Sequence, residues 1–341
     1  MAGRPGAGPR LSFRRGRHII AAVNSEPWQF RLVKRSLKKK IKLRLLDRHL
    51  RADDSRVALD LGCAQGILSY FVRRKGGFWV SADEDLANVR TAREILRDDL
   101  VTLSGTALPF RDGSFDLVVG LDYLEHVEDD GRVLEEISRV LKKGGELVLV
   151  TPQTGPFFVL HKLRAALGLR LEHFGHKREG YALATLDRML SRVSLRLVAS
   201  SDYSRFFSEF FELLLNFAYV KILAPAAAGK VRDGHIRPAS EGEFSAQAGL
   251  FGGYSLVYPL VWLLSQLDRL LFFEKGYSVM VRAIKQGVGE LGNRAAFGDI
   301  SADPRRRDEE NRVFCYNSAD GCLYRRRGGS GAQGRGSRHP R

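Results

Sequence analysis

Residues 57–66 read Val-Ala-Leu-Asp-Leu-Gly-Cys-Ala-Gln-Gly. The first five residues form a short apolar run with one aspartate, which is typical of a strand buried in a parallel sheet. Gly62 and Gly66 come directly after it, and a helical pattern begins behind them. Glycine lets the backbone turn sharply and approach a bound ligand closely. We therefore predict a strand, a ligand-binding turn and a helix in this order.

Strand-like and helix-like segments alternate after this turn. Such alternation predicts an α/β fold with a parallel sheet and crossover helices. We expect further strands at 78–82, 101–103, 115–120, 146–150, 194–200 and 276–282, and helices at 85–98, 130–142 and 184–193.

Asp83 follows the second predicted strand, at the sheet edge where α/β folds bind their ligands. A carboxylate there can accept hydrogen bonds from both hydroxyls of a ribose. The glycine pattern of a dinucleotide site is absent because Ala64 stands between Gly62 and Gly66, and the chain has no phosphate-binding P-loop motif. The sequence therefore predicts a nucleoside-bearing cofactor other than a dinucleotide.

Four further segments, in this order and spacing, carry a resemblance. They are Ser81–Asp83, Leu108–Asp116, Leu124–Val127 and Leu141–Leu147. With the 57–66 turn, they make the chain resemble the class I S-adenosylmethionine-dependent methyltransferases, in particular the type 11, ubiquinone-methyltransferase-like group. The resemblance covers about residues 57–200 and the last strand. It implies a Rossmann-like, doubly wound, mostly parallel sheet with an antiparallel last strand, and S-adenosylmethionine as the cofactor.

The resemblance also implies roles for individual residues. Two positions depart from the family pattern: Ala64 replaces the middle glycine of the turn, and Ser104 replaces an acidic residue that usually contacts the adenine. The adenine contact is then weaker or made elsewhere. The resemblance implies that the methionine part of S-adenosylmethionine is bordered by Asp60, Gly62 and Gly66, with Cys63 and Ala64 between them. It places Asp83 and Glu84 at the ribose of the cofactor and Ser104 and Gly105 at the adenine. Leu121 and Asp122 would lie at the sulfonium.

A hydroxyl acceptor would need a base, and His126 is the first candidate because it follows the fourth predicted strand. Glu125 and His161 are alternatives, with Tyr181 as a residue that could orient the base. The competing interpretation is that His126 only packs beside the helix that starts near residue 130. We expect no metal site, because the pair His173 and His176 and the pair Cys315 and Cys322 lack further ligands nearby in the sequence.

The net charge of +16 is concentrated at the two ends of the chain. Residues 1–56 hold 16 Lys and Arg against 4 Asp and Glu, and residues 304–341 hold 10 against 4. The segment between them is close to neutral, which argues against a nucleic-acid substrate, because such enzymes carry positive charge around the substrate groove. The apolar run 18–23 is too short for a secretion signal, and three cysteines suit a reducing compartment, so we expect a cytoplasmic protein.

The composition predicts five segments. We expect a disordered basic N-terminus (1–28), a basic amphipathic helix (29–50), a methyltransferase domain (51–204 and 274–286), an apolar helical insertion (205–273) and a disordered tail (287–341).

Two interpretations of the segments 29–50 and 205–273 stay open. The helix could pack on the domain edge with its basic side in water, or lie on an anionic membrane surface. The insertion could be a lid over the sheet, a wall for a lipid-like acceptor or a surface that dips into a bilayer. Neither of its apolar stretches offers the uninterrupted length of a membrane-spanning helix. The second interpretation implies peripheral association with a membrane.

Methyl transfer to a small, hydrophobic or lipid-linked acceptor is the leading functional hypothesis. The acceptor atom is left open among oxygen, carbon and nitrogen. RNA or protein methylation is one alternative, prompted by the basic ends. A non-catalytic cofactor-binding module at a membrane is another, prompted by Ala64 and Ser104.

Overall fold

The computed structural model describes residues 27–34, 36–155, 159–169, 171–218, 248–271 and 275–287, together with residues 242 and 245. The predicted disordered segments 1–28 and 287–341 lie outside this range, apart from residues 27, 28 and 287.

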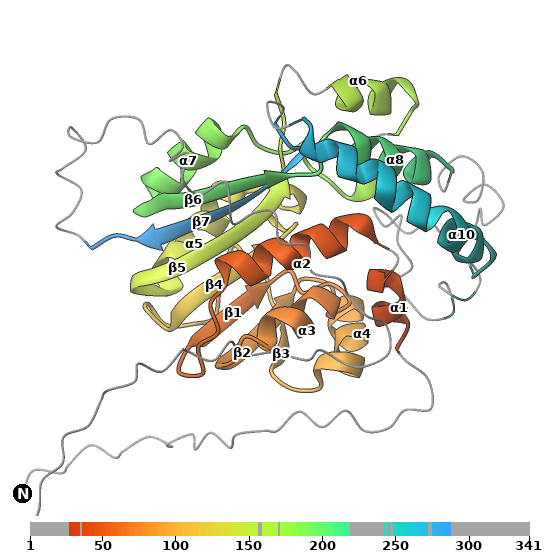
Figure 1. The fold of residues 1–341 in the computed structure, drawn as a ribbon. Helices are drawn as coiled ribbons and strands as arrows, with labels where there is room; N and C mark the ends of the chain where they lie inside the picture. The colour runs from red at the N-terminus through yellow and green to blue at the C-terminus, as the bar shows by residue number, and fades with distance from the viewer. Residues whose placement is uncertain are drawn as a thin grey trace, which may run out of the picture. The chain divides into compact units, whose positions relative to one another are not determined.

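A seven-stranded sheet forms the centre of the described domain, with the strand order β3-β2-β1-β4-β5-β7-β6 (Figure 1). β7 runs antiparallel to both of its neighbours, and all the other pairs are parallel. The predicted doubly wound sheet with an antiparallel last strand is therefore confirmed. The strands are β1 (Val57–Leu61), β2 (Phe78–Asp83), β3 (Leu100–Thr102), β4 (Phe115–Leu121), β5 (Leu141–Pro152), β6 (Leu195–Tyr203) and β7 (Ser278–Lys285).

Helices cover both faces of the sheet, and each face has its own apolar core. Because side chains alternate along a strand, Leu59 of β1 packs on one face and Ala58 on the other. The face with Leu59 is covered by α5 (Asp130–Val140) and α7 (Leu183–Arg192), and the face with Ala58 by α2 (Leu37–His49) and α3 (Ile67–Arg73). α4 (Leu86–Leu96) contacts β2 and β3.

The segment predicted as one helix over 29–50 is two helices, α1 (Trp28–Lys34) and α2. A new helix starts because the hydroxyl of Ser36 accepts a hydrogen bond from the N–H of Lys39 at 3.3 Å, as an N-cap residue does. The basic side is not all in water as one interpretation expected, because Lys39 and Lys42 are buried.

The insertion between β6 and β7 contains α8 (Phe206–Ala218), α10 (Ala248–Ser265) and the short η4 (Gln266–Arg269). η4 is tied to the start of α8 because the Asp268 carboxylate accepts hydrogen bonds from the N–H groups of Arg205, Phe207 and Ser208. α8 also contacts α10 and α6 (Val159–Ala166). Within the described ranges, no helix combines the length and apolar character needed to cross a bilayer.

Both ends of the insertion meet at one point of the sheet. Tyr203, the last residue of β6, is paired with Ser278, the first residue of β7. The N–H of Tyr277 donates to the carbonyl of Ser204 at 2.8 Å, which extends the pairing by one step. The insertion therefore leaves and re-enters the domain through adjacent, hydrogen-bonded residues.

Candidate active site

The turn after β1 is shaped by two glycines in left-handed conformations. Gly62 has φ +83° and Gly66 has φ +81°. A Cβ on Gly62 would lie 2.6 Å from Cδ2 of Tyr123, so the position has no room for a side chain. Ala64 also has a positive φ of 46°, a conformation that costs a non-glycine residue about 1–2 kcal/mol. The turn therefore keeps the shape of a three-glycine loop with alanine at its middle position.

Asp83 points from the end of β2 into this turn. Its Oδ2 accepts a hydrogen bond from the N–H of Ala64 at 2.8 Å. Its Oδ1 accepts from the N–H of Asp85 and from Nδ2 of Asn88, each at 3.0 Å. The carboxylate thus holds the left-handed Ala64 in place. It also lines the cavity described below, and Oδ2, which accepts one hydrogen bond in the protein, has a second lone pair that can accept a hydroxyl.

Asp60 lies fully buried within β1, one strand away from Asp83. Burial raises the pKa of its carboxyl above the ordinary value, while the hydroxyls of Ser69 and Ser81 oppose the change. Its Oδ2 has no hydrogen-bond partner among the residues that the structure describes. A buried carboxylate oxygen without a partner is costly, and a ligand that brings a donor such as an ammonium group would satisfy it. This donor set, with the side-chain-free space at Gly62, fits the methionine and ribose parts of S-adenosylmethionine.

Glu84 supplies a carboxylate where Ser104 lacks one. Its Oε1 accepts hydrogen bonds from the hydroxyl of Ser104 at 3.1 Å, from the N–H of Gly105 at 3.2 Å and from the hydroxyl of Tyr123 at 2.9 Å. Tyr123 thereby joins the turn after β1 to the loop after β3. The sequence pattern gave no signal for Tyr123, because its two contacts come from segments far apart in the chain.

A cavity of about 710 Å³ connects these residues to the helices of the insertion. Asp60, Gly62 and Asp83 lie at one end; Arg164 of α6 and Glu209 of α8 lie at the other. Most predicted cofactor residues line it, including Cys63, Ala64, Glu84, Leu121 and Asp122, but Gly66, Ser104 and Gly105 do not. Gly66 instead packs against Ala92, and Ser104 and Gly105 reach the cavity only through Glu84.

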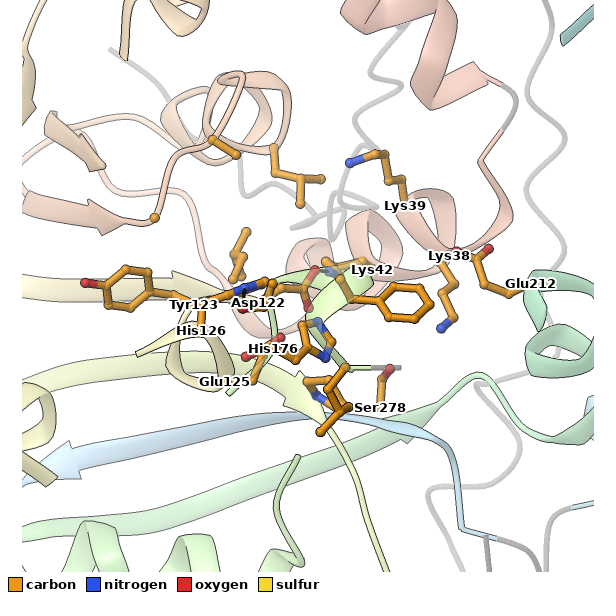
Figure 2. Close-up of a pocket in the computed structure, with 18 of the residues that line it drawn as sticks. Lys38, Lys39, Lys42, Asp122, Tyr123, Glu125, His126, His176, Glu212 and Ser278 are labelled. Atoms are coloured by element: carbon orange, nitrogen blue, oxygen red, sulfur yellow. Dashed lines mark hydrogen bonds and ion pairs between the residues drawn. The ribbon is translucent and has the colours of Figure 1, made fainter. Parts of the chain in front are cut away.

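The middle of the cavity holds Glu125 and His126 of η1 (Leu124–His126) and His176 (Figure 2). Glu125 has no exposed surface; Oε2 accepts a hydrogen bond from Thr151 at 3.3 Å, and no described residue is a hydrogen-bond partner of Oε1. Burial, together with the nearby Asp122 carboxylate, raises the pKa of Glu125 above its usual range.

His126 is held at one ring nitrogen. Its Nδ1 lies 2.9 Å from the carbonyl oxygen of Gly175, which can only accept, so Nδ1 carries the proton and the lone pair of the neutral ring is on Nε2. The ring meets that of His176 edge to face, with centroids 4.8 Å apart. His176, which the sequence placed in a loop beside His173, thus belongs to the site.

Glu125, His126 and His176 each offer one ligand atom, and these atoms lie within 4.8 Å of one another. A carboxylate and two imidazoles form a donor set that could hold a divalent cation. From the sequence we predicted no metal site, because the pair His173 and His176 has no further ligand nearby along the chain. The structure brings the three together through the contact between η1 and the loop around Gly175.

Basic side chains of α2 and α6 complete the cavity wall. Lys42 pairs with Asp122, which has a positive φ of 53° directly after β4 (Figure 2). Lys38 Nζ and Arg164 Nη2 lie 2.7 and 2.6 Å from the two carboxylate oxygens of the buried Glu209. The basic helix therefore directs part of its charge into the cavity, which the sequence pattern did not reveal.

The other two catalytic candidates have different surroundings. His161 lines the cavity, with Nε2 3.1 Å from the carbonyl oxygen of Gln153, and burial lowers its pKa. Tyr181 is not a lining residue; its hydroxyl donates to Asp130 at 2.7 Å at the start of α5. Tyr181 therefore supports the η1–α5 corner and does not orient His126 directly.

Comparisons with known proteins agree with this geometry. Residues 59–149 match the family model described as a methyltransferase domain. A ubiquinone biosynthesis O-methyltransferase of Parvibaculum lavamentivorans is 32% identical over 98 residues, which are 27% of this chain and 39% of that protein. An uncharacterized methyltransferase of a Mycobacterium species (strain KMS) is 35% identical over 104 residues, 30% of this chain and 41% of that protein. The chain thus spans about two fifths of these relatives.

Two solved structures have a similar arrangement. The YcgJ protein of Bacillus subtilis has a TM-score of 0.46 at 16% identity, over 73% of this chain and 99% of that chain. Geranyl diphosphate C-methyltransferase of Streptomyces coelicolor has a TM-score of 0.46 at 15% identity, over 72% of this chain and 76% of that chain.

The strand order, the glycine turn and the matched residues lead to one conclusion. Over residues 59–149, which run from β1 into β5 of this sheet, the chain contains a domain of the methyltransferase-domain family.

Proposed function

We propose that the chain transfers a methyl group from S-adenosylmethionine to a hydroxyl of a small acceptor. The observation that carries this proposal is the single cavity that runs from Asp60 and Asp83 to His126. Its volume of about 710 Å³ lies in the range of small-molecule sites. Two reactants held in one cavity react as a unimolecular pair, which removes much of the entropic barrier. Relatives named for O-methylation in ubiquinone biosynthesis favour oxygen as the acceptor atom.

Three residues at the strand ends would hold the cofactor. Asp60 would accept a hydrogen bond from its ammonium group, Asp83 would accept from its ribose hydroxyls, and Gly62 leaves space for its chain. The bound cofactor supplies an electrophilic methyl group on a sulfonium, so the protein needs no further activation of the donor.

His126 is the residue we assign to the acceptor's proton. Its Nδ1 donates to the carbonyl of Gly175, so the lone pair of Nε2 is the basic atom. As the bond from the acceptor oxygen to the methyl carbon forms and the carbon–sulfur bond breaks, the hydroxyl proton passes to Nε2. His126 would thus act as a general base, a role that contributes about 10²–10⁴-fold to a rate.

Labelled methyl donor and fractionated host extract test this function. We expect label in the small-molecule or lipid fraction with the native chain. His126→Asn should lower the rate by about 10²-fold and leave the Kd for S-adenosylhomocysteine unchanged. Asp83→Ala should weaken that binding by about tenfold or more. Arg90→Gln, at an exposed position on α4, is the matched control and should change neither quantity. Adding EDTA to the assay reports whether a divalent cation at Glu125, His126 and His176 is required.

The same experiment separates the competing functions. Label in RNA or protein would replace the small-molecule proposal, and for RNA the affinity should then fall steeply with salt. Calorimetric binding of the cofactor without label in any fraction would favour a non-catalytic module. No binding at all would contradict both.

We further propose that the acceptor is borne by a lipid and reached from an anionic membrane surface. With the exception of Leu86, the exposed large apolar side chains of the described residues lie on α6, α8, α10 or just after η4. α10 contains no charged residue, and Leu256 on it is 84% exposed. α6 and α8 also line the cavity through Arg164 and Glu209, so this apolar face adjoins a polar chamber. An apolar face next to a polar cavity suits a lipid with a polar head group.

Basic residues beside α10 favour a membrane over a second protein copy. Lys40 Nζ donates to the hydroxyl of Tyr258 of α10 at 2.8 Å. Burial raises the pKa of that tyrosine, and the positive charge of nearby Arg44 opposes the rise. Arg269 follows α10 on η4 and is exposed. An apolar helix bordered by cations is the pattern of an interfacial helix on anionic lipids.

Flotation with vesicles tests the membrane proposal independently of methyl transfer. The native chain should float with phosphatidylcholine–phosphatidylserine vesicles, and Leu256→Gln with Leu260→Gln should weaken the association by about tenfold or more. Leu86→Gln is the matched control, because Leu86 is 48% exposed but lies on α4. Equal flotation of all three proteins, or a stable dimer that the double variant disrupts, would overturn the proposal.

A further inference from the structure

A second, smaller cavity lies at the other end of α2. His49, the last residue of α2, lines it with Arg51, Arg56, Glu146 of β5 and Arg282 of β7. It shares no lining residue with the large cavity. Its volume is about 140 Å³, the liquid volume of about four or five water molecules. The space therefore suits a small ion and excludes a nucleotide.

Positive charge dominates this small cavity. Three guanidinium groups face one carboxylate, and among the residues that the structure describes no carboxylate forms an ion pair with Arg51 or Arg282. At the edge of the cavity Arg56 forms a long ion pair with Asp53, with Nε 3.9 Å from Oδ2. The surroundings of His49 show the same excess of positive charge, since burial and the charges of Arg282 and Arg48 all lower its pKa.

Arg282 provides the second observation. Its Nε is buried and has no hydrogen-bond partner within the described part of the chain. Withdrawing a guanidinium donor from water without a partner costs free energy, and a bound anion would supply both the acceptor and the opposite charge. A guanidinium presents its donors in a planar fork that matches two oxygens of a phosphate group.

We propose that His49, Arg51, Arg56 and Arg282 form a binding site for inorganic phosphate. Phosphate matches the volume, the donor geometry and the excess positive charge of the cavity. Glu146 contributes to selectivity: at neutral pH its carboxylate can accept a hydrogen bond from the P–O–H of the monoanion. The site does not depend on the proposed methyl transfer.

Thermal unfolding in inorganic phosphate, with sodium chloride adjusted to constant ionic strength, tests the site. The native chain should show a saturable rise in Tm, about 2–4 °C at ten times the Kd. Arg282→Gln should lose the phosphate-dependent rise. In phosphate-free buffer it should unfold at or above the native Tm, because a repulsive charge is removed. Arg90→Gln removes the same charge from an exposed position on α4 and should keep the rise.

A second variant covers the case in which Arg282→Gln does not fold. Arg51 is exposed, so Arg51→Gln should fold normally and should reduce the rise in Tm at least by half. Broadening of the ³¹P signal of phosphate by the native chain, and not by Arg51→Gln, would support the site directly. No rise in the native chain, or the same rise in the native chain and both cavity variants, would overturn it.

Discussion

Glu125 and Glu209 line the same cavity and are both buried, yet their carboxyl groups behave in opposite ways. Burial alone would raise the pKa of both. Glu209 faces Lys38 and Arg164, and their charges lower its pKa to about 2 in spite of burial. Glu125 faces the Asp122 carboxylate and a threonine hydroxyl, and its pKa is raised.

The difference shows that partners, and not burial, decide what a carboxylate in this cavity can do. Glu209 is satisfied by the protein, with both oxygens in ion pairs and one also accepting from Ser204 at 3.1 Å. It joins α2, α6 and α8 and is a structural group. Glu125 has an oxygen without a partner, so it is available to a ligand.

The largest effect on stability is expected for Glu209→Gln. The variant leaves Lys38 and Arg164 largely buried without their carboxylate, which should lower the free energy of unfolding by about 3–5 kcal/mol. Urea unfolding measures the change. Glu212→Gln, on the same helix but without an ion pair among the described residues, should change stability by no more than about 0.5 kcal/mol. Equal losses in both variants would show that Glu209 has no special role.

Acid should remove the contribution of Glu209. Because its pKa is about 2 in the folded chain and near 4.5 when unfolded, the ionised form stabilises the fold at pH values above 4.5. This stabilisation, about 3 kcal/mol, is lost as the pH falls from about 5 towards 2. The difference in unfolding free energy between the native chain and Glu209→Gln should therefore shrink over that interval. A constant difference down to pH 2 would contradict the ion pairs.

Glu125→Gln should not lower the free energy of unfolding as Glu209→Gln does. Within the part of the chain that the structure describes, no cation forms a salt bridge with Glu125, so the variant breaks none. It replaces a buried acid by a neutral amide. We expect the free energy of unfolding at pH 8 to stay equal or to rise by about 1 kcal/mol. Urea unfolding beside Glu209→Gln makes the comparison direct. A loss of more than about 2 kcal/mol would mean that Glu125 is a structural group like Glu209.

The smallest effect on stability is expected at a third carboxylate, which has no cation as a partner. Glu84 is exposed and its hydrogen-bond partners are neutral, among them the buried hydroxyl of Tyr123 at 2.9 Å. Tyr123→Phe removes the bond to Glu84 and the bond that the hydroxyl accepts from the N–H of Gly105, which still donates to Glu84, and should cost about 1 kcal/mol of unfolding free energy. Because the ring still packs beside Gly62, the affinity for S-adenosylhomocysteine should fall less than in Asp83→Ala. Calorimetry of both variants checks the order.

The two ends of the cavity also differ in how far the sequence predicts them. Asp60 and Asp83 lie near the carboxyl ends of the neighbouring strands β1 and β2, and Gly62 directly follows β1, so their meeting at one sheet edge follows from the β-α-β pattern. At the other end, Lys38, Arg164 and Glu209 come from three helices far apart in the chain. Neither periodicity nor segment charge indicates which acid a lysine will meet.

The same limit applies to the basic segment. Counting charges over 29–50 does not reveal that Lys38 and Lys42 pair with acids at the cavity. The division into α1 and α2 rests on one capping hydroxyl, Ser36, inside an otherwise continuous pattern. His176 was weighed with its neighbour in the sequence, His173, whereas its partner in the structure is His126.

The closure of the insertion at Ser204 and Tyr277 has a practical consequence. Since entry and exit are already hydrogen-bonded to each other, a segment of different length could be spliced between them at little extra entropic cost. The β6–β7 junction is then a graft point at which the insertion could be exchanged while the strands that carry Asp60 and Asp83 stay unchanged.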